Sequence, residues 1–80
     1  MKLLHFTGND GLALLQAARS LKGAERSSAE FYIRRVLHKA LGVNLNTLLT
    51  GAVLYVDCDG RRVLKLVQSA AALEIESLLP

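Results

Sequence analysis

The amino-acid sequence predicts a small α+β domain in which an antiparallel sheet packs on helices. Three observations lead to this prediction: two amphipathic helical stretches occupy residues 7–41, a hairpin pattern follows at residues 52–67, and 51% of the 80 residues are hydrophobic. Ordering such a chain costs on the order of 100 kcal/mol, which only a well-filled apolar core offsets. We expect a single domain over residues 1–80, with the order β-α-α-(short helix)-β-β-α.

Short motifs predict the first two elements. Lys2–Phe6 alternates weakly between polar and apolar residues and is expected to form a strand at a sheet edge. Thr7 and Asp10 match a capping box, in which two side chains satisfy free backbone N–H groups of the first helical turn. The helix that follows is expected to run to about Leu21 and to stop at Gly23.

The second helix has the clearest signals in the sequence. Ser27 and Glu30 form a second capping box, and Gly42 stands where the chain must turn left-handed to stop. At 100° per residue one stripe is apolar and is expected to face the core. Its members are Ala29, Ile33, Val36, Leu37, Ala40 and Leu41. A short helix capped by Asn44 is expected next, ending at Gly51.

A two-residue turn at Asp59 and Gly60 is predicted between two β-branched runs, because both turn positions need a positive φ. That turn would pair Asp57 with Arg62 and Val56 with Val63. The residues after the hairpin, 68–79, show apolar positions at helical spacing and are expected to form a last helix.

Both faces of the predicted hairpin are apolar, and one layer of helices covers only one of them. The tail helix or a second copy of the chain would have to cover the other. The excess of apolar residues in so short a chain favours a homodimer. Its interface is expected to include Leu54, Val56 and Val63.

The outer side of the second helix is the one surface with a distinctive chemical character. It combines an aromatic residue with basic ones: Phe31, Arg34, Arg35, His38 and Lys39. With a net charge of +3 and a pI near 9.4, anionic partners are permitted but not required. We expect a non-catalytic interaction module that binds a protein with an acidic surface through this face. The alternative is a nucleic-acid-binding regulator that also uses Arg61 and Arg62.

No catalytic, cofactor or metal site is predicted. His5, His38 and Cys58 lie on separate elements and lack the spacing of metal ligands. Residues 56–60, Val-Asp-Cys-Asp-Gly, resemble the aspartate loop of haloacid-dehalogenase-type phosphatases, which implies a nucleophile at Asp57 and an acid at Asp59. Because that family needs a far longer chain for its lysine and metal carboxylates, we favour a hairpin turn here.

Residues 36–51 resemble the closing helices of lambda-repressor-type helix-turn-helix domains. The matching positions are core and cap residues, and none belongs to a recognition helix, so the resemblance implies no DNA contact. A single cysteine, Cys58, fits a reducing compartment, and no apolar run approaches the length of a membrane span. The Leu/Ala/Arg-rich composition suggests a bacterial or phage source, and the small size fits a regulatory or inhibitory protein, which we expect in the cytoplasm.

Overall fold

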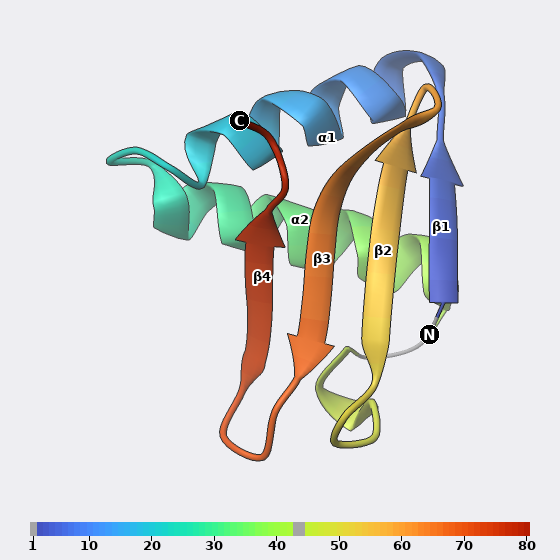
Figure 1. Ribbon diagram of the computed structural model, residues 1–80, viewed down its shortest axis with the longest axis vertical. Coiled ribbons are helices and arrows are strands. Elements are labelled where there is room, and N and C mark those ends of the chain that lie inside the picture. The colour runs from blue at the N-terminus through green and yellow to red at the C-terminus, as the bar shows by residue number, and fades with distance from the viewer. Residues whose placement is uncertain (1, 43–44) are drawn as a thin grey trace.

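Helices α1 and α2 lie side by side behind a four-stranded sheet and leave its front face open (Figure 1). The computed structural model describes residues 2–42 and 45–80. The elements are β1 (Lys2–Phe6), α1 (Gly8–Ser20), α2 (Arg26–Leu41), the 3-10 turn η1 (Leu45–Thr47), β2 (Val53–Cys58), β3 (Arg61–Gln68) and β4 (Leu73–Ser77). The α+β class is confirmed, with one core between the helices and the sheet.

The sheet is mixed, whereas the sequence had predicted an antiparallel one. Its strand order is β1-β2-β3-β4, and β1 runs parallel to β2, with Lys2 opposite Leu54 and Phe6 opposite Cys58. The other neighbours are antiparallel. The reason is the connection: the two helices carry the chain from the end of β1 back to its starting side, and a strand that begins there runs parallel.

The β2–β3 hairpin turns where the sequence predicts. Asp59 and Gly60 have φ angles of 51° and 83°, and Asp57 pairs with Arg62. Beyond that pair the register differs from the prediction, because a β-bulge shifts it and places Val56 opposite Leu64. The extra residue on β3 turns the following leucines toward the same face as the apolar residues of β2.

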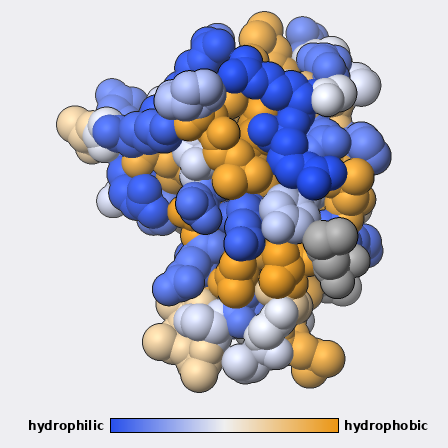
Figure 2. Space-filling model, viewed as in Figure 1, coloured by the Kyte–Doolittle hydropathy of each residue, from blue (hydrophilic) through white to orange (hydrophobic). Residues whose placement is uncertain are grey.

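The bulge brings the buried apolar residues of the hairpin together on one face of the sheet, the side that packs on the helices. Leu54, Val56 and Val63, expected at a dimer interface, are 4%, 0% and 0% exposed inside the core. In this fold they offer no surface to a second copy. Strand alternation turns Tyr55 and Lys65 to the open face. Figure 2 shows this face as a mixture of apolar and hydrophilic side chains.

The tail is a strand, so the predicted last helix is wrong. Ser69 closes a tight turn, in which its N–H and hydroxyl donate to the carbonyl of Ala72 at 2.9 and 2.8 Å. After the turn, Leu73 and Ile75 are buried while Glu74 and Glu76, which follow each of them, are exposed. This period of two is the pattern of a half-buried strand, and it outweighs the helical spacing of the longer segment.

The helix ends follow the predictions only in part. Gly42 ends α2 with φ 70°, as expected, and its N–H donates to His38. Neither capping box forms. Thr7 is the N-cap of α1 as predicted but makes no side-chain cap bond, and the N-cap of α2 is Glu25 instead of Ser27. Since α2 begins at Arg26, Glu30 lies within the helix, 3.2 Å from the Arg26 guanidinium. The predicted cap at Asn44 lies outside the described residues.

Candidate docking surface on helix α2

Four of the five residues predicted on the outer side of α2 are exposed together. Phe31 is 67% exposed, and Arg35, His38 and Lys39 are exposed as well. We call these four residues the basic face. Their position follows from the helical phase, because Ile33 and Leu37 on the opposite side are fully buried.

The fifth predicted residue, Arg34, is directed away from this face. Its Nη2 donates to the carbonyl of Leu73 in β4 at 3.1 Å, and the residue is half-buried. Arg26, two turns earlier, donates in the same way to Ile75 at 3.2 Å. Lys22 donates to the carbonyl of Leu79. Arg34 therefore belongs to a row of cations that hold the C-terminal strand.

Arg35 lies between two aromatic rings. Its guanidinium carbon is 6.0 Å from the ring centre of Phe31 and 5.8 Å from that of Tyr32. Contacts of this kind contribute about 0.5–1 kcal/mol at exposed sites. Within the described part of the chain, Arg35, His38 and Lys39 form no ion pair. The charges of Arg35 and Lys39 are thus available to a partner.

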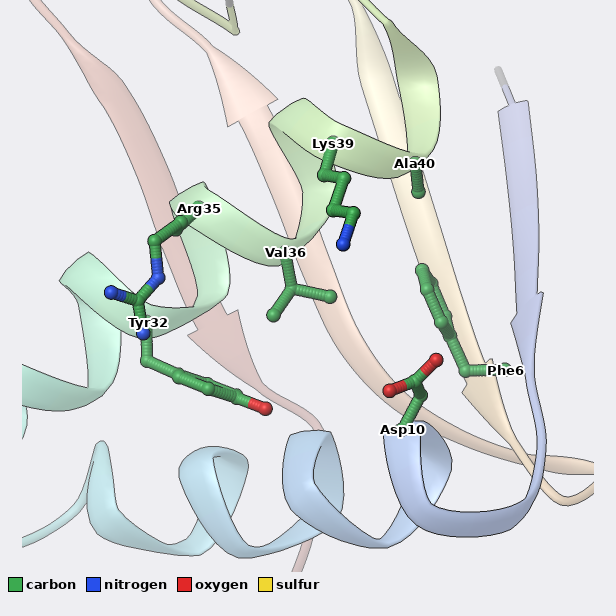
Figure 3. Close-up of a pocket in the computed structure, with 7 residues that line it drawn as sticks. All are labelled: Phe6, Asp10, Tyr32, Arg35, Val36, Lys39 and Ala40. Carbon is green, nitrogen blue, oxygen red and sulfur yellow. The ribbon is translucent and has the colours of Figure 1, made fainter.

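A cavity of about 540 Å³ opens beside the basic face, between α1, α2 and the end of β1 (Figure 3). It is lined by Phe6, Asp10, Tyr32, Arg35, Val36, Lys39 and Ala40. Sequence reasoning missed Phe6, Asp10 and Tyr32 as site residues and assigned Val36 and Ala40 to the core. No local pattern could have indicated the cavity, because it depends on how far apart the two helices lie.

The hairpin arginines belong to a different surface. The Nε of Arg62 donates to Asp57 at 3.1 Å, and its guanidinium carbon lies 4.8 Å from the ring centre of Tyr55. Asp57 is 9% exposed, and its other oxygen is 4.0 Å from the Nδ1 of His5. This cluster stands on the open face of the sheet, which α2 does not cover. Arg61 is exposed beside it.

Of the residues considered for catalysis, Cys58 is buried and His5 lies beside Asp57. Among the described residues, no group of three or more His, Cys, Asp or Glu side chains could hold a metal ion. Burial raises the pKa of the Cys58 thiol, and the carboxylates of Asp59 and Asp57 raise it further, so the reactive thiolate is disfavoured. The two aspartates of the dehalogenase-like segment occupy an ion pair and a turn.

The geometry thus defines a two-layer α+β module with an aromatic-basic helix face and an adjoining cavity. Comparisons of the chain with models of protein families, with curated proteins and with solved structures found no match. Over residues 2–42 and 45–80, neither helix has the length and apolar character that crossing a bilayer requires.

Proposed function

We propose that this chain is a non-catalytic interaction module that binds a protein with an acidic surface through the basic face of α2. The observation that supports this most directly is Phe31, 67% exposed next to cations without ion-pair partners among the described residues. Aromatic side chains ringed by polar groups are frequent anchors of binding interfaces.

The charges of the basic face favour an anionic partner. Arg35 and Lys39 stand four residues apart on one helix, a spacing at which like charges repel by a few tenths of a kcal/mol. The helix dipole offsets this for Lys39 in the last turn but less for Arg35. Carboxylates placed against both side chains would relieve the repulsion and form charge-assisted hydrogen bonds.

Nucleic-acid binding is the second candidate, supported by the exposed Arg61 and the positive net charge. The positions of the cations favour protein binding instead. Arg62 is paired with Asp57 on the open sheet face, whereas α2 covers the opposite face. One stretch of phosphate backbone would have to wrap around the sheet to contact both the hairpin arginines and the basic face.

We also propose that the chain forms a homodimer, as its apolar composition favours. Because Leu54, Val56 and Val63 are buried, the surface to consider is the open face of the sheet, where Tyr55 and the half-buried Val53 and Val67 lie. Light scattering at micromolar concentration tests this. A monomer mass would contradict it.

The binding proposal can be tested with a double charge reversal, Arg35→Glu with Lys39→Glu, and with Phe31→Ala. All three positions are exposed, so the variants should fold. A displayed library of short random peptides should yield acidic binders that the wild type retains and both variants lose. Retention of full affinity by both variants would refute the role of the basic face.

Short duplex DNA serves as the second probe in the same test. Arg61→Glu, a charge reversal outside the basic face, is the matched control and should leave peptide binding unchanged. Tight DNA binding with a steep dependence on salt, weakened by Arg61→Glu, would favour the nucleic-acid alternative, because counterion release produces that slope.

A further inference from the structure

The cavity between α1 and α2 combines an apolar floor with charged groups at its rim. Phe6 and Val36 supply the apolar surface, and Asp10, Arg35 and Lys39 supply the charges. In Figure 3 the side chains of Phe6, Asp10, Val36 and Lys39 point toward a shared space between the two helices. The Arg35 side chain lies over the Tyr32 ring at the edge of this space. Its volume of about 540 Å³ is within the range of pockets that bind small molecules or peptide side chains.

Polar groups without partners converge on this space. The ring of Tyr32 lies along one wall with its hydroxyl directed into the cavity, and the ammonium group of Lys39 reaches down into it (Figure 3). In the described part of the chain the Tyr32 hydroxyl makes no hydrogen bond and Lys39 no ion pair. Both are therefore ready to bind an incoming anion or carbonyl.

A further hollow lies along the same helix pair, and we call it and the cavity together the groove. This second hollow, of about 340 Å³, shares Tyr32 with the first. Small side chains of both helices form part of its lining, which also includes longer polar and charged ones: Ala13, Gln16, Ala17, Ser20, Glu25, Ser28 and Ala29. Because Glu25 would repel carboxylates, the acidic side chains of a bound segment belong at the first cavity, beside Arg35 and Lys39. Small residues leave room for a main chain to approach, so the two hollows together suit an extended segment better than a compact molecule.

We infer that this groove takes an extended acidic segment of the partner, with one aromatic side chain in the cavity and carboxylates on Arg35 and Lys39. The inference rests on the proposed function and deepens it, because it specifies what the partner presents. Charge complementarity supports this occupant: the two cations are on the α2 rim, where they would contact glutamate or aspartate side chains.

Asp10 determines how such a segment would lie. Its carboxylate is on the α1 side of the cavity, opposite the cations (Figure 3). It would repel an acidic side chain there and accept a hydrogen bond from a peptide N–H instead. The same carboxylate disfavours a phosphate backbone in the groove, because the phosphates would lie against it.

The test uses the peptide acetyl-Glu-Glu-Phe-Glu-Glu-amide as probe, titrated into the isotope-labelled chain and followed by NMR shifts of the backbone amides. The largest shifts should map to Asp10, Tyr32, Val36 and Lys39. Replacing the phenylalanine of the peptide by alanine should weaken binding about tenfold, and replacing its glutamates by lysine should abolish it. A wild-type chain that does not bind the probe at millimolar concentration would overturn the inference.

A cavity-filling substitution tests the location. Ala40→Phe places a ring in the cavity from an exposed position, so the chain should fold while affinity for the probe falls about tenfold or more. Ala24→Phe, the same substitution at an exposed residue outside both hollows, is the matched control and should bind normally. Lys39→Gln, which removes only a charge, should weaken binding about threefold or more.

The variants Phe31→Ala and Ala40→Phe distinguish a failure of this inference from a failure of the proposed function. If Phe31→Ala abolishes probe binding and Ala40→Phe does not, the basic face binds without the groove, so the inference fails and the proposed function stands. If Ala40→Phe abolishes binding, the groove is the site. A probe that fails to bind overturns the inference alone, because the peptide-library experiment tests the proposed function independently.

Discussion

Replacing Arg34 by methionine should destabilise the C-terminal strand, although sequence analysis had assigned this residue to partner binding. Arg34 donates to the carbonyl of Leu73 at 3.1 Å, on the edge of β4 that no strand covers. A hydrogen bond from a charged donor contributes about 1.5–3 kcal/mol, and competition from water at this half-buried site lowers the expected loss to about 1–2 kcal/mol. Methionine keeps the apolar stem, so the change removes the guanidinium alone.

Thermal unfolding followed by circular dichroism measures the effect. In a domain of this size 1 kcal/mol corresponds to roughly 4–8 °C, so the Tm should fall by roughly 5–15 °C. Arg35→Met, one residue along on the exposed side, is the control and should change the Tm by no more than about 3 °C. Amide exchange should accelerate most in β4. Equal Tm values for the two variants would refute the assignment of Arg34 to the strand.

Three further outcomes are expected. Because burial raises the pKa of the Cys58 thiol, iodoacetamide should alkylate the folded chain far more slowly than the urea-unfolded chain. The free energy of unfolding should fall as the pH rises above about 8.5, because the thiol ionises in the unfolded chain before it ionises in the folded one. Gly11→Ala should lower stability by about 1–2 kcal/mol in urea unfolding, since its Cβ would lie 3.0 Å from the backbone carbonyl of Phe6, whereas Gly23→Ala, with nothing closer than 3.9 Å, should be nearly neutral. Asp57→Asn should lower the free energy of unfolding by about 1–2 kcal/mol in the same assay, because the nearly buried side chain loses the negative charge that pairs with Arg62.

Local signals in the sequence predicted the parts of the fold that local physics determines. The turn at Asp59 and Gly60 needs two positive φ angles, and the end of α2 at Gly42 needs one, so both positions were predicted correctly. The bulge in β3 and the strand at the C-terminus were not predicted. Both depend on contacts between distant segments, such as the hydrogen bond from Leu78 to Val63.

The candidate site likewise has parts that local sequence determines and parts that depend on contacts between distant segments. Helical phase placed Phe31 and Arg35 on the outside of α2, because burial of the opposite stripe fixes the rotation of the helix. It could not show that Arg34, at the border between the two sides, reaches β4. Tyr32 and Asp10 come together only when α1 packs beside α2, so no spacing in the sequence links them.

The cations along β4 also disfavour the addition of a further strand at that edge of the sheet. Arg26 and Arg34 occupy carbonyls of β4 that an added strand would need, so pairing at this edge would first have to break both contacts. Strand addition is therefore favoured at β1, the opposite edge of the sheet. Copies that met edge to edge would join β1 to β1 and stop at two, because the β1-to-β4 contact that would propagate a filament is obstructed.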